Sequence, residues 1–275
     1  MIIIFLLTFA QEAVSAPSDF LPDSPLPALG KQTLTFENGA DLAILIDDMG
    51  HSIFSNTQAL ALPGPVSFAF LPFARHSKEM ALNAKALNKD VLMHAPMESI
   101  HKLSLGPGGM TSDMSEVDFK AMLLRDIDAI PHLVGVNNHM GSQLTTLNDP
   151  MRWTMDVLKE RGLFFIDSRT TAKSVAWQQA VKAGMVGVQR DVFLDHELNR
   201  RAIQRQFLKA IARAKYSGHA LLIAHPHQIS INFLKNNLAR LKDRGVQLIS
   251  VSQLVEKLKL KRLAQASEQG YKKAS

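Results

Sequence analysis

From residue 42 onward, short apolar runs alternate with longer stretches of helical periodicity. The runs are rich in β-branched and aromatic residues, and most do not alternate between apolar and polar positions. This pattern is typical of parallel strands that are covered on both faces. The predicted strands are 42–47, 66–72, 90–96, 134–140, 163–168, 185–194, 220–226 and 246–251.

The segments between these runs carry helix start and stop signals. In the segment 148–162, Asp149 can cap a helix, Pro150 suits its first position and Gly162 suits the position just past its end. In the segment 115–131, Ser115 and Asp118 resemble a capping box, and Pro131 ends the helical pattern. Strands and helices therefore alternate along the chain.

This alternation predicts an α/β fold, an irregular (β/α) barrel of seven to eight parallel strands in a single domain over residues 39–258. A doubly wound open sheet is the alternative. The glycine-rich residues 106–110 lie in an unusually long connection, and we expect them to form a mobile loop over a site.

The two ends of the chain differ from this central domain. Residues 1–10 are apolar, and small residues follow at 13–16, so residues 1–16 are interpreted as a signal peptide, with an N-terminal membrane anchor as the alternative. Residues 17–38 form a Pro-rich linker, and residues 259–275 a basic tail. We therefore expect an exported protein of the periplasm or cell envelope.

The composition excludes some kinds of site and some kinds of partner. The chain has no cysteine, so disulfides, thiolate metal sites and cysteine nucleophiles are excluded. Its net charge of +6 arises from two segments, 199–217 and 255–275. In the first, Arg201, Arg205 and Lys209 follow helical spacing, which favours a solvated helix face over contact with an anionic surface. We expect no nucleic-acid partner, and at most peripheral contact of these basic segments with the envelope.

Groups that can bind metal or move protons follow five of the predicted strands. The carboxyl ends of parallel strands form the active-site face of such folds, so these side chains should lie together. They are Asp47 and Asp48, His94, Asn138 and His139, Asp167 and Arg169, and His225 and His227, with Asp191 as a further candidate.

Asp47 and Asp48 are adjacent carboxylates at the end of an apolar run. Their mutual repulsion and the loss of hydration near a core call for a stabilising cation. One carboxylate would bind a divalent metal together with His94 and His139, a ligand set typical of an open zinc-like site. The other would act as a general base on water whose pKa the metal lowers.

The segments "IDDMG", "MHAPME", "NNHMGS", "IDSRT" and "AHPH" occur in an order that resembles the divergent polysaccharide deacetylase family, a distant branch of the NodB-like carbohydrate esterases. The resemblance covers about residues 40–257. It implies an irregular (β/α) barrel that binds a divalent metal, with zinc as the expected ion. It also implies removal of N-acetyl groups from amino sugars of envelope polysaccharide or peptidoglycan.

Carried over onto this sequence, the resemblance implies that Asp47 is the catalytic base, Asp48 the metal-binding Asp, His94 a metal ligand and His225 the general acid. His139 lies where better-known members have an Arg-Pro-Pro-Tyr motif, so its role as a ligand belongs to the divergent branch.

Two departures from the better-known members stand out. A second metal His four residues from His94 is absent, and Glu98 could replace it as a ligand or bond to His94. "DSRTT" stands where those members have Asp-x-x-Asp-Trp.

We assign Glu98, Asn138, Asp167, Arg169 and His227 substrate-binding or supporting roles. Two other functions remain open. One is a non-catalytic envelope protein that binds a glycan or a partner on the same barrel. The other is hydrolysis of a different amide, such as a peptide crosslink. The pairing of Asp47 and Asp48 with His225 favours an enzyme, because a binding protein needs neither a base nor an acid.

Overall fold

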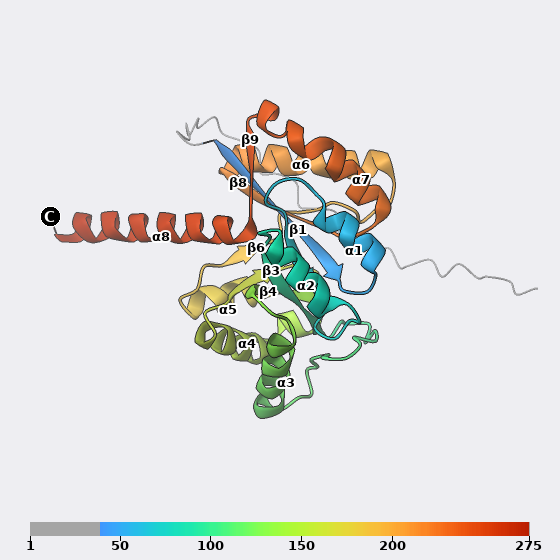
Figure 1. The fold of residues 1–275 in the computed structure, drawn as a ribbon. Coiled ribbons are helices and arrows are strands. Elements are labelled where there is room, and N and C mark those ends of the chain that lie inside the picture. The colour runs from blue at the N-terminus through green and yellow to red at the C-terminus, as the bar shows by residue number, and fades with distance from the viewer. Residues whose placement is uncertain (1–38, 275) are drawn as a thin grey trace, which may run out of the picture. The chain divides into compact units, whose positions relative to one another are not determined.

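The computed structural model describes residues 39–274, so the predicted signal peptide and linker lie outside the described residues. Strands and helices alternate through most of this part (Figure 1). The strands are β1 Ala40–Met49, β2 Ser67–Phe70, β3 Val91–Met97, β4 Leu133–Met140, β5 Phe164–Asp167, β6 Val188–Gln189, β7 Val192–Phe193, β8 His219–Ala224 and β9 Val246–Ile249. The α-helices are α1 Ile53–Leu60, α2 Ser77–Ala86, α3 Glu116–Ala129, α4 Asn148–Glu160, α5 Ala176–Lys182, α6 Arg200–Ser217, α7 Gln228–Asn237 and α8 Val251–Ala274.

The strands form one parallel sheet in the order β6-β5-β4-β3-β2-β1-β8-β7, with β9 paired to the first half of β1. The two strands at the ends of this order, β6 and β7, are joined by only Arg190 and Asp191. So short a link holds the two ends together, and the sheet must curl. The fold is therefore a curled, barrel-like α/β domain, which confirms the predicted fold class.

One predicted strand is wrong in its extent. Residues 185–194 are not one strand but two short ones, β6 and β7. The backbone N–H of Arg190 donates to Asp167 at the end of β5, whereas that of Asp191 donates to Leu221 in β8. The chain crosses from one edge of the curled sheet to the other at this point, so a single continuous ladder is impossible.

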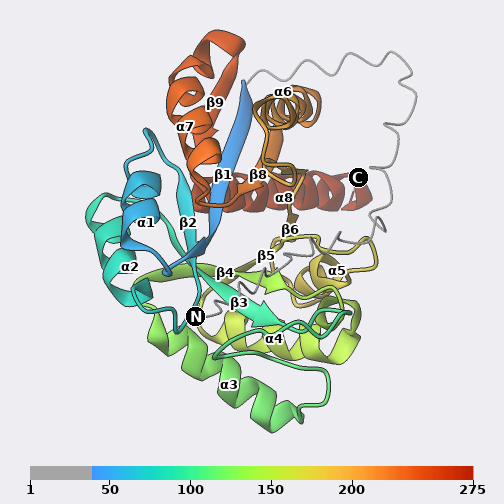
Figure 2. The ribbon, with the colours of Figure 1, turned by 90° about the vertical axis from the view of Figure 1, so that its right-hand side faces the viewer.

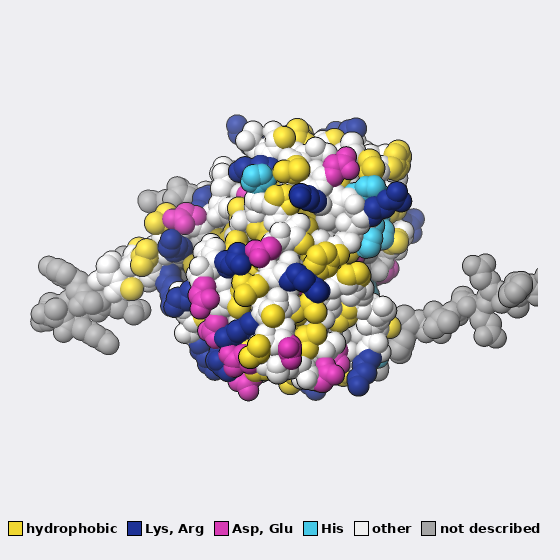
Figure 3. Space-filling model, turned by 60° about the horizontal axis from the view of Figure 1, so that its bottom comes forward, with side chains coloured by type: hydrophobic (Ala, Val, Ile, Leu, Met, Phe, Trp, Pro, Cys, Tyr) yellow, Lys and Arg dark blue, Asp and Glu magenta, His cyan; other side chains and the backbone are white. Residues whose placement is uncertain are grey.

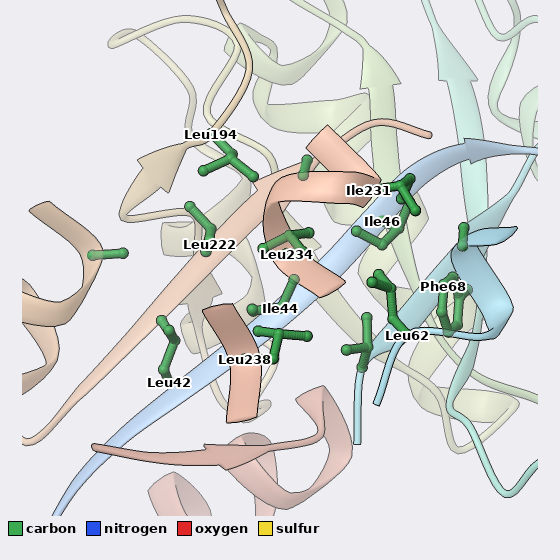
Figure 4. Packing of buried hydrophobic residues seen from close by; sticks show 14 of the residues in the cluster. Leu42, Ile44, Ile46, Leu62, Phe68, Leu194, Leu222, Ile231, Leu234 and Leu238 are labelled. Atoms are coloured by element: carbon green, nitrogen blue, oxygen red, sulfur yellow. The ribbon is translucent and has the colours of Figure 1, made fainter. Parts of the chain in front are cut away.

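Residues of β1 alternate between two hydrophobic layers. Leu42, Ile44 and Ile46 pack outward against side chains of α7 and the neighbouring strands (Figure 4). Ala43 and Leu45 point the other way, into a cluster formed by most of the strands and by the start of α8. Because both faces of β1 are buried, its sequence is continuously apolar, as parallel strands require.

Helix α8 covers the amino-terminal ends of the strands. The N–H of Ser252 in its first turn donates to the Asp90 carboxylate just before β3 (2.7 Å). Lys257 pairs with Asp41 at the start of β1 (2.7 Å), and Arg262 donates to the Met185 carbonyl before β6. The helix runs unbroken across the predicted boundary at 258–259, so the basic tail continues α8. The carboxyl ends of the strands are left for a site.

The remaining helices surround the sheet. Helices α3 and α4 pack together beside β3 and β4, and α6 and α7 lie beside β8 and β1 (Figure 2). Acidic and basic side chains are interspersed on the face that Figure 3 shows. Among residues 39–274, none of the helices has an apolar stretch of the length that a bilayer crossing requires.

The basic helix 199–217 forms as predicted, with Asn199 as its N-cap. Its charged face is solvated, and Arg205 and Arg213 pair with Glu197 and Asp191.

The glycine-rich residues 106–110 fold back against β3. The N–H of Met110 donates to the Pro96 carbonyl, and that of Glu98 donates to the Met110 carbonyl (both 2.9 Å). Gly108 has φ +84°, and a Cβ there would lie 2.8 Å from a carboxylate oxygen of Asp126 in α3. This segment is thus tied to the sheet, and glycine is required where it meets α3.

Candidate active site

Asp47 and Asp48 reach the same site through an irregularity at the end of β1. The register of β1 against β2 shifts between Ile46 and Met49, and Asp48 adopts a left-handed backbone conformation with φ 55°. A regular strand would point adjacent side chains to opposite faces. The left-handed residue, a conformation that Asp tolerates better than most side chains, lets both carboxylates face the same histidines.

Three potential metal ligands converge beside this turn. Asp48 Oδ1 lies 2.9 Å from His139 Nδ1 and 3.2 Å from His94 Nε2. The three ligand atoms all lie within 4.8 Å of one another. Asp48 Oδ1 is buried, yet it makes no hydrogen bond of acceptable geometry in the described chain. An oxygen and two imidazole nitrogens aimed at one point without bonding to each other fit a divalent cation.

Electrostatics support the same assignment. Burial opposes ionisation of Asp48, but the neighbouring His139 and His94 hold the pKa of its carboxyl well below its usual range. Burial likewise opposes charge on His94, but Asp47 and Asp48 raise the pKa of His94 to about 9. The metal-free chain thus holds a proton on His94 where a cation would otherwise balance the two carboxylates. Metal binding would displace that proton.

Asn137 connects the catalytic-base candidate with a ligand candidate. Its Nδ2 donates to both oxygens of Asp47 (2.9 and 3.0 Å), and its Oδ1 lies 2.9 Å from His94 Nδ1. An amide oxygen can only accept, so His94 must carry its proton on Nδ1 to make this bond. Once a metal displaces the second proton of His94, Nε2 is left with a free lone pair, which is the tautomer that a metal ligand requires.

His225 and Asp195 form a second hydrogen-bonded pair at the same end of the sheet. Asp195 Oδ1 lies 3.0 Å from His225 Nδ1, while its Oδ2 accepts from the His225 backbone N–H and from Ser230 Oγ. His225 Nε2 lies 3.8 Å from Asp48 Oδ2. Burial disfavours charge on the ring, but the bond to Asp195 outweighs it and raises the pKa of His225. His225 thus faces the carboxylate pair, and its surroundings favour the protonated ring.

Asn137 and Asp195 were not predicted from the sequence. The residue predicted at the end of β4 was Asn138, whose side chain points the other way. The residue predicted after the strand 185–194 was Asp191, which instead accepts from the Leu221 N–H and pairs with Arg213. The rule that found the other residues, a polar group at the carboxyl end of a strand, would have selected Asp195 had β7 been placed correctly.

Asn138, Asp167 and Arg169 support the backbone around the site. Asn138 donates to the Met140 carbonyl and accepts from the Ser168 N–H, which joins the ends of β4 and β5. Asp167 accepts from the Arg169 N–H and from Ser174 Oγ. The side chain that holds the Asp47 carboxylate is that of Asn137.

Glu98 and His227 lie at the margin of the site. Glu98 Oε2 accepts from the Ser112 N–H (2.7 Å), so this carboxylate anchors the chain after the glycine-rich segment. The two ring nitrogens of His94 face Asn137 and the carboxylate pair, so the predicted bond from Glu98 to His94 is wrong. His227 is exposed, and its ring centroid lies 5.9 Å from that of His225.

Known proteins resemble this chain in sequence and in fold. The family described as divergent polysaccharide deacetylase matches residues 44–255. The uncharacterized Escherichia coli K12 protein YibQ is 34% identical over 214 residues, which cover 78% of this chain and 67% of YibQ. A crystal structure of an uncharacterized protein from Agrobacterium tumefaciens C58 has a TM-score of 0.77 at 22% identity, covering 80% of this chain and 91% of that one.

Peptidoglycan deacetylase PdaC from Bacillus subtilis has a TM-score of 0.52 at 16% identity, over 85% of this chain and 98% of that one. At this level of identity the likeness shows a shared fold. The family match covers more than half of the chain and spans every residue of the metal and proton-transfer clusters described above. The chain therefore belongs to the divergent polysaccharide deacetylase family.

Proposed function

We propose that the protein is a metal-dependent hydrolase that removes N-acetyl groups from amino sugars of envelope polysaccharide or peptidoglycan. The observation that carries this proposal is the convergence of Asp48 Oδ1, His94 Nε2 and His139 Nδ1 next to a buried carboxylate and a histidine pair. These three residues would hold one divalent cation, and zinc suits an Asp and two His. Such a cation would lower the pKa of water and polarise the amide carbonyl.

Asp47 is suited to take the proton from the attacking water. It is almost fully buried, its Oδ2 lies 3.7 Å from His94 Nε2, and Asn137 fixes both of its oxygens. Burial raises the pKa of Asp47 above its ordinary value, against the opposing effects of His94, His225 and Asn137. A carboxylate with a raised pKa accepts a proton more readily, which is what a general base requires.

His225 is suited to protonate the leaving amine. Because Asp195 fixes its Nδ1, its Nε2 faces the carboxylate pair and can carry the transferable proton. The bond to Asp195 raises the pKa of His225, which favours the protonated ring. A base and an acid therefore face a single cation site, as amide hydrolysis requires.

Export of the protein to the periplasm or cell envelope is part of the proposal, because that is where the substrates named above occur. It is supported by the apolar residues 1–10 and the small residues at 13–16. Sequencing the N-terminus of the protein recovered from cells would test it. A signal peptide predicts a mature chain that begins at about residue 17, whereas an anchor predicts an uncut one.

The test of function combines metal content with acetate release from N-acetylated oligosaccharides. We expect one divalent cation per chain, and His139→Ala should lower metal affinity at least ~10-fold. His76→Ala is the matched control, because His76 lies near Glu79 at the start of α2 and outside the ligand set. Unchanged metal affinity in His139→Ala would remove His139 from the site. No acetate release by the metal-loaded protein on any such glycan would reject the enzyme.

A glycan- or partner-binding protein without catalysis is the second candidate. The observation that favours it is that no histidine lies four residues from His94 in the sequence, where Glu98 instead anchors the backbone of Ser112. Such a protein would bind metal and N-acetylated glycan but release no acetate. Peptide-crosslinked fragments in the same assay would reveal hydrolysis of a different amide.

A further inference from the structure

Two loops beside the metal-ligand candidates expose large apolar side chains. Residues 51–54 follow β1, and residues 100–103 follow β3; every one of these eight side chains is exposed. Phe54 is 69% exposed, Ile100 64%, Leu103 56% and Ile53 46%. Single exposed apolar side chains are ordinary on a protein surface. Several of them grouped beside one site instead indicate an interaction surface.

Hydrogen bonds place both loops at the mouth of the site. The N–H of Ile100 donates to Ser142 Oγ (3.0 Å), three residues after His139. On the other side, the Gly50 carbonyl accepts from the His76 N–H (2.9 Å), which ties the loop after Asp48 to the loop after β2. The three loops therefore surround the ends of the strands that carry Asp48, His94 and His139. We call residues 51–54, 71–78 and 99–106 the rim loops; the first two of these segments include the opening residues of α1 and α2.

The rim loops are basic as well as apolar. They contain Arg75, Lys78 and Lys102 and no Asp or Glu. Arg125 of α3 lies 5.1 Å from the centre of the Phe73 ring and adds a further positive charge. Glu79, the residue after Lys78, lies 3.9 Å from His76 Nδ1 and is the acid next to this segment in the sequence.

This combination does not suit a platform for sugar rings. Trp and Tyr, which combine an apolar ring face with a polar group, are both absent from the rim loops. Ile, Leu and Phe tips flanked by Lys and Arg instead match the boundary of an anionic bilayer. Apolar tips enter the acyl region there, and cations contact the headgroups.

We propose that the rim loops dock the active-site face onto an anionic phospholipid surface. This contact is distinct from the basic face of α6, whose arginines are partly paired with acids and lie along one helix. In the docked orientation the site opens toward the lipid. Its substrate would then be an amino sugar carried by a lipid, a consequence that rests on the proposed function, whereas the docking itself does not.

The absence of cysteine from the chain allows a direct test with single-cysteine variants. Phe54→Cys and Leu103→Cys of the full chain are labelled with an environment-sensitive fluorophore and mixed with vesicles of phosphatidylcholine, with and without phosphatidylglycerol. Leu87→Cys is the matched control: Leu87 is 53% exposed but lies just before β3, at the opposite end of the sheet. The fluorophore reports only the environment of the labelled residue. Membrane binding by residues 1–10 therefore does not by itself change the fluorescence at positions 54, 87 or 103.

We expect a blue shift and quenching by spin-labelled lipid at positions 54 and 103 on phosphatidylglycerol vesicles, and neither at position 87. Lys102→Gln should weaken this response about fivefold, since a cation near an anionic surface contributes about 1 kcal/mol, while Lys85→Gln in α2 should not. Labels at 54 and 103 that stay in water, or that shift equally with position 87, would overturn the proposal. A shift without vesicles that grows with protein concentration would assign the rim loops to a second copy instead. None of these readings depends on acetate release.

Discussion

Asp48 combines an uncommon backbone conformation with two close histidines, and both features serve one site. Its φ of 55° costs some conformational energy for any residue with a Cβ, and such positions cluster where structure serves function. The result is that Asp47 can be dedicated to proton transfer while Asp48 faces His94 and His139. Adjacent acids could not divide these roles on a regular strand, whose side chains point to opposite faces.

If Asp47 is the base, Asp47→Asn should keep the fold and the metal, because the shape is retained and one buried charge is removed. It should lower turnover about 10²–10⁴-fold, the usual contribution of a positioned acid or base. Melting temperature, metal content and acetate release are measured together for both proteins. Full deacetylation by the variant, or a large loss of stability without a specific loss of chemistry, would show that Asp47 is structural.

Asn137 should act as a positioning residue. Asn137→Ala removes the Nδ2 group that donates to both oxygens of Asp47. It also removes the Oδ1 acceptor that fixes the tautomer of His94, so metal affinity should fall about 10–100-fold. Loss of these two hydrogen bonds to the carboxylate also raises the pKa of Asp47 further. The acidic limb of the pH profile of kcat/KM should therefore move to higher pH.

The matched control for Asn137 is Asn138→Ala, whose side chain bonds only to the backbone of Met140 and Ser168. It should lower melting temperature without moving the acidic limb. An unmoved acidic limb in Asn137→Ala would assign that residue a purely structural role.

At the scale of elements, the sequence predicts well where strands are long and buried on both faces. β1, β3 and β4 were located, and with them Asp48, His94 and His139, because a continuous apolar run fixes both the strand and its polar end. β6 and β7 were not resolved, because two strands of two residues each carry no periodicity. Asn137 was missed for another reason: choosing between it and Asn138 requires knowing which face of β4 meets the site.

Helix α3 contains a buried acid whose carboxylate oxygens have no hydrogen-bond partner in the described chain. Asp126 is fully buried under Gly108, with Arg125 Nε 3.9 Å away. Burial raises the pKa of Asp126 to about 7, against a smaller opposing effect of Arg125. The folded protein therefore binds this proton more tightly than the unfolded chain does. Stability should be retained near pH 4 and fall as pH rises through about 7.

Asp126→Asn removes this titration. The gain in stability of the variant over the parent protein should be about 1–3 kcal/mol larger at pH 8 than at pH 5, because a shift of one pKa unit corresponds to about 1.4 kcal/mol and the parent loses this stability between the unfolded and the folded pKa. Urea unfolding at both pH values measures the difference. Asp128→Asn, an exposed neighbour paired with Arg161, is the control and should give no gain at either pH. An equal effect of Asp126→Asn at pH 5 and pH 8 would contradict the assignment.

At the scale of the whole domain, the end of the sheet opposite the site is closed by α8. The predicted domain ended at 258, yet the same helix continues to Ala274, and sequence alone gave no reason to join a basic segment to the barrel. The polar contacts that join α8 to the sheet include a bond from the Ser252 N–H to Asp90, an ion pair with Asp41 and a bond to the Met185 carbonyl. These contacts link residues far apart in sequence, which is why composition could not reveal them.

The closure by α8 should contribute to the stability of the whole sheet. Leu254 is 1% exposed and packs with Leu45, Leu92 and Ile249 in the same cluster, so Leu254→Ala should lower the free energy of unfolding by about 2–5 kcal/mol. Leu263→Ala, nine residues further along the same helix and 58% exposed, should change it by less than about 0.5 kcal/mol. Urea unfolding followed by circular dichroism and by tryptophan fluorescence tests both values. If the two probes report one transition for Leu254→Ala, α8 belongs to the cooperative unit; if the helix signal is lost first and the fluorescence is unchanged, α8 is an appendage and this account of the closed end is wrong.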